Sequence, residues 1–348
     1  MPRISSRAAT ILDVAKKAGV SFKTVSRVLN NEANVRTETQ EKVRKAIEAL
    51  NYSPSLAART LAGSRSFLIG LLYDTPSSYY IHSIQVGALE RCREAGFHLI
   101  LEKSNSGTKE AAAAVLSSIR QTRMDGVILT PPVSDSVAIR DVLVEQNIPY
   151  VLISPPKIDP GTNCVYMEDQ RAAFDITAYL ISLGHSRIAF IKGHPRHGAA
   201  KLRLLGYREA LRHIAITPNN AFVKEGNFRF QSGVAAAEEL LQLKAPPTAI
   251  LAANDEMAAG VIVAAHRLGL KIPDDISVAG FDDVPYASIT WPALTTIRQP
   301  ISEMGAEAAS LLLRQLPSGE SSSRNNARAI AFQHELKIRE STGPARKR

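Results

Sequence analysis

The chain has 348 residues, which is too long for one ordinary compact domain and predicts two or three. Its composition is 45% hydrophobic, enough for a sizeable core, yet no apolar run approaches the ~18 residues that span a bilayer. The first twenty residues show no signal-peptide block, so we expect a soluble, cytoplasmic protein. Two cysteines, Cys92 and Cys164, exclude a disulfide framework and lack metal-ligand spacing; we expect core thiols, no metal and no cofactor.

The formal charge of +9 is concentrated at the two ends of the chain. Residues 1–65 hold twelve Lys and Arg against five Asp and Glu, and residues 339–348 hold four against one. The long middle of the chain is close to neutral. A compact basic segment fits a polyanionic partner such as DNA, although a solvated basic surface without a partner would carry the same charge.

Short helices separated by tight turns are predicted at the start of the chain. Thr10 followed by Asp13 is a capping-box pattern, which predicts the start of the first helix. Gly19 ends that helix, because a left-handed residue is needed there. Ser21 then caps a second helix, Phe22–Leu29, whose valines face inward.

The second predicted helix presents Phe22, Lys23 and Arg27 on its outer face. A third helix is expected to start with Thr37 and Gln40 in another capping-box pattern. Three short helices, a glycine turn and a basic exposed face predict a helix-turn-helix, whose second helix fits a DNA major groove about 12 Å wide. An ordinary small helical bundle is the alternative.

This segment resembles the lac-repressor (LacI/GalR) family of bacterial regulators. The matching residues are Thr10-Ile11, Asp13-Val14-Ala15, Ala18-Gly19-Val20-Ser21 and Thr24-Val25-Ser26-Arg27-Val28-Leu29-Asn30. The resemblance implies base-edge contacts by Phe22, Lys23 and Arg27. It also implies phosphate contacts by Ser21, Thr24 and Asn30. Lys and Arg can donate to guanine, whereas Phe22 can only pack on a thymine methyl group or a sugar.

Residues 53–65 are predicted to form a hinge helix and linker. A helix of about eight residues is marginal in water, so it should need DNA or a partner chain to order it. The resemblance continues through Tyr52-Ser53-Pro54, Ala58-Arg59 and Leu61. It implies that the hinge pairs with its dimer mate in the minor groove through Ala58, Arg59 and Leu61, where Leu61 wedges between base pairs. For Leu61, a plain apolar linker residue is the alternative.

From residue 66 onward, apolar runs alternate with helical segments. The runs lack polar alternation, which predicts strands buried on both faces of parallel, helix-covered sheets, hence an α/β core of two doubly wound subdomains behind a small all-α head. The expected strands are Phe67–Tyr73, His98–Leu101, Gly126–Thr130, Tyr150–Ile153, Ile188–Ile191, Ala249–Ala252 and Ser277–Phe281. The expected helices are Ile84–Ala95, Asp169–Leu183, Leu205–Arg212, Gly233–Leu243 and Glu256–Leu268.

The resemblance covers residues 10–342 and implies a core like a type I periplasmic sugar-binding protein. The predicted domains are a head at 8–52, the hinge and linker at 53–65, a ligand-sensing core at 66–342 and a basic tail at 343–348. Within the core we expect an N-subdomain at 66–164 and 298–327 and a C-subdomain at 165–297 and 328–342. Disorder is expected at the extreme N-terminus, at 317–326 and in the tail.

The ligand is expected between the subdomains, at the carboxyl ends of strands. The candidate effector-binding residues are Asp74, Tyr80, His197, Arg203, Asn254 and Asp282. The resemblance implies this role for Tyr80, Arg203 and Asp282 in particular. Asp, Asn and Arg can bond the hydroxyl groups of a sugar, and an aromatic ring can stack on its face. Helix capping is the alternative for an Asp or Asn after a strand, and it is the role expected for Asp255.

Catalytic motifs are not evident: the sequence shows no nucleophile elbow, Walker loop, GxGxxG opening or HExxH site, so no enzyme is expected. A free periplasmic sugar-binding protein is also disfavoured, because it would not carry the basic capped head. The sequence therefore predicts a transcriptional repressor that binds a palindromic operator as a homodimer, with its affinity switched by a sugar-like effector. The tail lacks leucine heptads, which favours a dimer over a tetramer.

Overall fold

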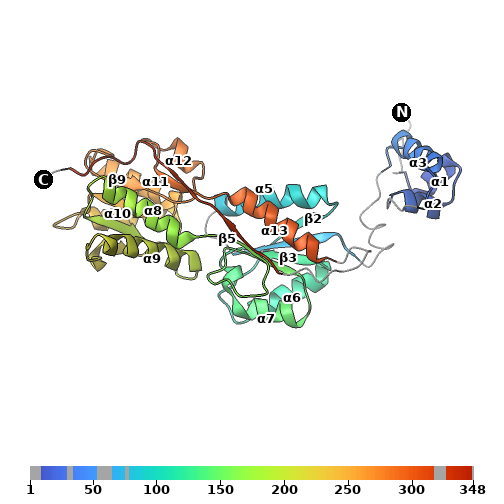
Figure 1. Cartoon of the computed structure of the whole chain (residues 1–348), viewed down its shortest axis with the longest axis horizontal. Helices are drawn as coiled ribbons and strands as arrows, with labels where there is room; N and C mark the ends of the chain where they lie inside the picture. Colours follow the sequence, from blue (N-terminus) through green and yellow to red (C-terminus); the bar gives the residue numbers. More distant parts are fainter. Residues whose placement is uncertain (1–8, 30–33, 53–64, 75–77, 317–326, 347–348) are drawn as a thin grey trace, which may run out of the picture. The chain divides into compact units, whose positions relative to one another are not determined.

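The structure is a computed structural model that describes residues 9–29, 34–52, 65–74, 78–316 and 327–346. The chain divides into two compact units, Met1–Phe67 and Leu68–Arg348 (Figure 1). Several predictions lie outside the described residues: Asn30, the hinge helix with Ala58, Arg59 and Leu61, and the disorder expected at the extreme N-terminus and at 317–326.

Three helices make up the described part of the first unit: α1 (Ile11–Ala18), α2 (Phe22–Leu29) and α3 (Thr37–Ala49). They pack around a small core that includes Val14 and Val25. The turn between α1 and α2 depends on Gly19, whose φ of 67° lies in the left-handed region. The predicted helix-turn-helix is confirmed.

The two predicted capping boxes have different outcomes. At α1 the box is present, because the Thr10 hydroxyl accepts from the Asp13 N–H at 3.4 Å and the Thr10 N–H donates to the Asp13 carboxylate at 2.8 Å. At α3 the prediction is wrong. Arg36 occupies the N-cap position without a side-chain bond, and the Gln40 amide donates to the Val35 carbonyl instead. Thr37 therefore lies one position too far into the helix to cap it.

A six-stranded parallel sheet forms the first half of the second unit, in the order β11-β5-β4-β3-β1-β2. Helices α5 and α13 lie along one side of it and α6 and α7 along the other (Figure 1). Its strands are β1 (Leu68–Tyr73), β2 (His98–Lys103), β3 (Gly126–Leu129), β4 (Tyr150–Ile153), β5 (Cys164–Met167) and β11 (Ala329–Phe332). Its helices are α5 (Ser78–Glu94), α6 (Ala111–Thr122), α7 (Val137–Glu145) and α13 (Ile301–Gln315), with a short 3-10 turn, η1 (Val133–Asp135).

A four-stranded parallel sheet, in the order β7-β6-β8-β9, forms the second half. Its strands are β6 (Ile188–Ile191), β7 (Val223–Lys224), β8 (Ala249–Ala252) and β9 (Ser277–Ala279). Its helices are α8 (Asp169–Ser182), α9 (Gly198–His213), α10 (Phe230–Leu241), α11 (Asp255–Arg267) and α12 (Tyr286–Ile289), with η2 (Asn220–Phe222). Helix α8 packs on α9, and α10 packs on α11. Two parallel sheets covered by helices agree with the predicted pair of doubly wound subdomains.

The crossings between the subdomains differ from the predicted boundaries at two places. Strand β5 pairs with β4 and β11, so residues 165–167 and 328–332 belong to the first sheet, not to the C-subdomain. The chain crosses only after β5 and β11 end. Strands β10 (Thr296–Arg298) and β12 (Glu335–Lys337) then pair antiparallel beside the crossings.

The basic tail was expected to be disordered from Gly343, and this is wrong for its described part, 343–346. The Gly343 carbonyl lies 3.0 Å from His185 Nε2, and the Ala345 N–H donates to the Leu183 carbonyl at 2.8 Å. Arg346 forms an ion pair with Asp275. Composition suggested a free tail, but a buried histidine distant in sequence holds it in place.

Within the described residues, no helix is both long enough and apolar enough to cross a membrane.

The Thr10 cap gives a stability prediction for the head. Thr10→Ala removes the acceptor of the Asp13 N–H and should destabilise α1 by about 1 kcal/mol. In the full-length chain, hydrogen exchange of the α1 amides should then be roughly five-fold faster. Thr37→Ala is the matched control, since Thr37 caps nothing and alanine favours a helix. Equal exchange in the Thr10→Ala and Thr37→Ala variants would contradict the assigned cap.

Candidate functional site

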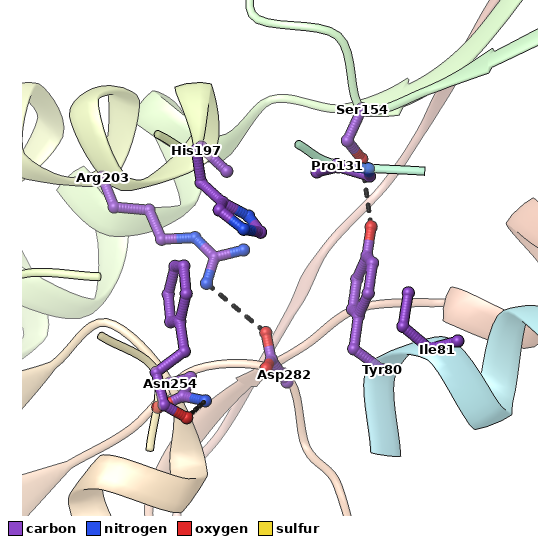
Figure 2. A pocket seen from close by; sticks show the side chains of 10 residues that line it. Tyr80, Ile81, Pro131, Ser154, His197, Arg203, Asn254 and Asp282 are labelled. Carbon is purple, nitrogen blue, oxygen red and sulfur yellow. Dashed lines mark hydrogen bonds and ion pairs between the residues drawn. The ribbon is translucent and has the colours of Figure 1, made fainter. Parts of the chain in front are cut away.

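The second unit contains a pocket between its two sheets with an empty volume of about 470 Å³, part of it open to solvent. Both subdomains contribute to the wall (Figure 2). From the first subdomain come Tyr80, Ile81, Pro131 and Ser154, and from the second come His197, Ala199, Arg203, Phe228, Asn254 and Asp282. Five of the six predicted effector residues are brought together there.

Arg203 is the most extensively bonded side chain in the wall. Its Nε donates to Asp169 at 2.7 Å, and its Nη1 donates to the Ala253 carbonyl at 2.6 Å and to Asp282 at 3.4 Å. The guanidinium also lies over the Phe281 ring, 3.7 Å from its centroid. The residue is only 5% exposed, so its charge is held by protein partners and not by water.

Asp282 faces Arg203 across the pocket floor and has an unusual backbone, with a φ of 115°. Its carboxylate accepts from the Gln299 side-chain amide at 2.6 Å as well as from Arg203. Burial raises the pKa of this carboxyl group to about 6, against the opposing effect of Arg203. The bonds to Gln299 and Arg203 hold the carboxylate in place without a ligand.

Tyr80 lies on the opposite wall, at α5 (Figure 2). Its hydroxyl lies 3.4 Å from the Ser154 hydroxyl, a long contact in which either oxygen can donate. Both hydroxyl groups belong to residues that line the pocket, and a hydroxyl group can donate one hydrogen bond and accept others. The predicted position of Tyr80 in the cleft matches this geometry.

His197 supplies the unsatisfied polar atom of the pocket. Its ring packs edge-on against Phe228, with centroids 5.2 Å apart, and it is 7% exposed. Its Nε2 is buried and has no hydrogen-bond partner among the described residues. Burial lowers the pKa of His197 to about 3, helped by the neighbouring His194 and Arg203, so the ring is neutral near pH 7. A buried polar atom left unpaired is costly unless a ligand or water satisfies it.

Asn254 lines the pocket as predicted, but it also caps the following helix, the role that was expected of Asp255. Asn254 caps α11, since its Oδ1 accepts from the Met257 N–H at 3.0 Å while its amide donates to the Phe228 carbonyl. Asp255 does not cap; it accepts from the Thr296 hydroxyl and the Val284 N–H. Burial raises the pKa of Asp255 well above its usual range. Asn254 reaches the pocket with one amide N–H and one lone pair of Oδ1 already used.

Asp74 is the predicted effector residue that is not among those lining the pocket. Its carboxylate accepts from the Ser106 N–H and hydroxyl at 3.2 and 3.0 Å and from Arg196 Nη1 at 3.2 Å. Arg196 comes from the other subdomain, so Asp74 lies in a contact between subdomains.

Three residues of the site region, Phe228, Ser154 and Asp169, were not predicted from the sequence. Phe228 has a φ of 67°, and its ring fills the space that a side chain at Gly193 would need. The only sequence signal was an aromatic residue in the Gly226-Asn227-Phe228 turn. Asp169 was predicted merely as the start of a helix, and nothing local showed that it would pair with Arg203.

The second candidate site is the outer face of α2. Phe22 is 51% exposed, and Lys23 and Arg27 are exposed beside it. Ser21 caps the helix by accepting from the Thr24 N–H at 3.1 Å, and its hydroxyl lies 2.9 Å from that of Thr24. The face is therefore basic, with hydroxyl groups at its N-terminal end. No group of three or more potential metal ligands occurs among the residues that the structure describes.

Family models match two segments of the chain. Residues 10–55 match the bacterial regulatory proteins of the lacI family, and residues 177–342 match a periplasmic binding protein-like domain. The HTH-type transcriptional regulator DegA of Bacillus subtilis (strain 168) is 34% identical over 339 residues, which cover 96% of this chain and 98% of DegA.

Solved structures agree with these matches. A lac repressor dimer bound to operator and the anti-inducer ONPF is 30% identical with a TM-score of 0.81, covering 97% of this chain and 100% of that one. A complex of the transcriptional regulator CelR with cellobiose is 29% identical with a TM-score of 0.72, covering 96% and 99%. The chain thus belongs to the lacI family of bacterial regulatory proteins, and it is a DNA-binding transcriptional regulator with an effector-binding core.

Proposed function

We propose that the effector is an uncharged, hydroxyl-rich small molecule such as a sugar. The observation that carries this proposal is the buried, unpaired Nε2 of the neutral His197, which can accept a hydrogen bond from a ligand hydroxyl. Tyr80 and Ser154 offer two further hydroxyl groups on the opposite wall. The CelR neighbour, whose complex contains cellobiose, supports the same ligand class.

The charge of the pocket wall also favours an uncharged ligand over an anion. Arg203 is the only cationic side chain among the residues that line the described pocket, and it already pairs with Asp169 and Asp282. A phosphate or carboxylate would meet the Asp282 carboxylate as well as a guanidinium already paired with Asp169. A polyol can donate to Asp282 without adding negative charge.

For the head, we infer that α2 reads an operator in the major groove. Lys23 and Arg27 would donate to base edges, and Phe22 would pack against a thymine methyl group or a sugar. The hydroxyl groups of Ser21 and Thr24 would contact phosphate, since each retains bonding capacity beyond its contact with the other. The proposed interface also includes Asn30 and the hinge residues Ala58, Arg59 and Leu61. Their inclusion rests only on the family resemblance.

We further infer a homodimer, which would place two heads on a palindromic operator as a repressor. The lac repressor neighbour is a dimer on its operator. In this chain, Trp291 is 84% exposed and Ile289 is 71% exposed, both near α12. Large apolar side chains gathered at one exposed place are typical of a protein interface.

The proposed domain division keeps a head at 8–52, a hinge and linker at 53–65, and a core from 66 with a basic tail after 342. Within the core, the two subdomain boundaries are moved so that β5 and β11 stay with the first subdomain. A regulator acts on the chromosome, so we place the protein in the cytoplasm and assign it binding without a catalytic step. A basic DNA-reading head would have no use in a free periplasmic sugar-binding protein.

Operator binding should depend on Arg27 in a sequence-specific manner. An operator site is first selected from a random DNA library. Arg27→Ala should weaken the free energy of binding to this site by about 1–3 kcal/mol and reduce the preference for one base at the position that Arg27 reads. Arg44→Ala, which removes an exposed charge from α3, is the control and should leave base preference unchanged. Fluorescence anisotropy from 50 to 200 mM salt should show affinity falling steeply. A flat salt response would contradict operator binding.

Effector affinity should depend on the polar atoms of the pocket. A thermal-shift screen of sugars would identify a ligand, and His197→Phe or Tyr80→Phe should then weaken its binding by about two- to ten-fold in calorimetry, as expected for one lost hydrogen bond. Tyr79→Phe is the control, because Tyr79 packs on Tyr286 outside the pocket lining. These shape-preserving changes are preferable to Arg203→Ala, which would leave Asp169 buried without its partner. Unchanged affinity in both pocket variants would place the effector elsewhere.

The dimer proposal has its own test. Trp291→Ser removes the most exposed large apolar side chain recorded among the described residues and should shift sedimentation velocity toward a monomer at low concentration. Val144→Ser, at a residue 59% exposed on α7, is the matched control and should leave the distribution unchanged. A dimer equally stable in both variants would show that the interface lies elsewhere.

A further inference from the structure

The turn 194–198, between β6 and α9, belongs to the second subdomain. One of its residues lines the pocket, and the residues on either side of that one bond to the first subdomain. His197 lines the pocket, whereas Arg196 and Gly198 contact residues of the first subdomain. The turn is internally braced, since the Arg196 N–H donates to His194 Nδ1 at 3.2 Å and the His197 N–H donates to the His194 carbonyl at 3.0 Å. These bonds tie Arg196 and His197 to the same residue of the turn.

Arg196 makes the first contact across the cleft. Its Nη1 donates to Asp74 at 3.2 Å, and its guanidinium covers Gly107 so closely that a side chain there would overlap it. Asp74 is fixed in turn by the Ser106 N–H and hydroxyl. A charged donor thus meets an acceptor that the first subdomain has already oriented.

Gly198 makes the second contact. Its N–H donates to Asp135 at 2.7 Å, at the first turn of α9, where a backbone N–H has no partner within the helix. Its α-carbon also lies against Pro156, so that a Cβ at this position would overlap the proline ring. This close approach requires glycine, and it places the start of α9 directly against the first subdomain.

We propose that the turn 194–198 is a clasp that holds the two subdomains closed in the absence of effector. Arg196 with Asp74 and Gly198 with Asp135 form its two ends, and neither acceptor lines the pocket. Closure is thereby set by contacts separate from the ligand site. A ligand bonded to His197 touches the middle of the clasp and can shift the balance between closed and open forms.

The test measures cleft closure directly in the full-length chain. Nitroxide labels at Glu145→Cys on α7 and Leu205→Cys on α9 report the distance between subdomains, since both side chains are exposed and Cys92 and Cys164 are buried. Labelled protein is diluted with excess unlabelled protein, so that only distances within one chain are measured. Neither effector nor DNA is added, so the result does not depend on the proposed ligand or operator.

Arg196→Ala should broaden the distance distribution toward longer values, and Gly198→Ala should shift it further, because the added Cβ forces Pro156 away. Arg212→Ala, at an exposed arginine on α9 with no role in the clasp, should reproduce the parent distribution. If Gly198→Ala fails to fold by circular dichroism, Asp74→Asn, which keeps the size of the side chain, replaces it and should lengthen the distance as well. A distribution unchanged from the parent in either folded clasp variant would overturn the proposal.

Discussion

The buried guanidinium of Arg203 is the interaction on which the second subdomain's half of the pocket depends. It reaches from α9 to Asp169 at the start of α8, to the Ala253 carbonyl after β8 and to Asp282 after β9. A buried charge is tolerated only when partners replace its water, and here three segments supply them. The carboxyl ends of the strands are thereby held in one arrangement around the ligand space.

Asp282 extends that constraint to the crossing segments. Its N–H donates to the Ile297 carbonyl at 2.8 Å, and its side chain accepts from Gln299, which follows β10. Because β10 leads into α13 of the first subdomain, the pocket floor is bonded to a segment that joins the two halves. An effector hydroxyl donated to Asp282 would therefore compete with bonds that connect the subdomains, which gives the pocket a physical connection to their relative arrangement.

The features that sequence predicted well depend on neighbours in the chain. Thr10 bonds Asp13, Ser21 bonds Thr24, and Gly19 needs only its own backbone angle. The seven expected strands were found within a few residues because runs of Val, Ile and Leu are recognisable without knowing their partners, whereas the buried strand β5 was not among them. At α3 the same reasoning failed. Thr37 and Gln40 have the spacing of a capping box, but the helix begins at Thr37, so Arg36 and not Thr37 occupies the N-cap position.

The pocket could be predicted only in part, because its bonds join residues far apart in the chain. Arg203 and Asp282 were found by family resemblance, but Asp169, which neutralises Arg203, carries no local sign of that role. Asp74 follows β1 in the place where a ligand contact is plausible, yet its partner is Arg196, 122 residues later. A polar residue after a strand can cap a helix, bind a ligand or join two subdomains. The choice depends on which distant residue the fold brings beside it, and that information is not local to the residue.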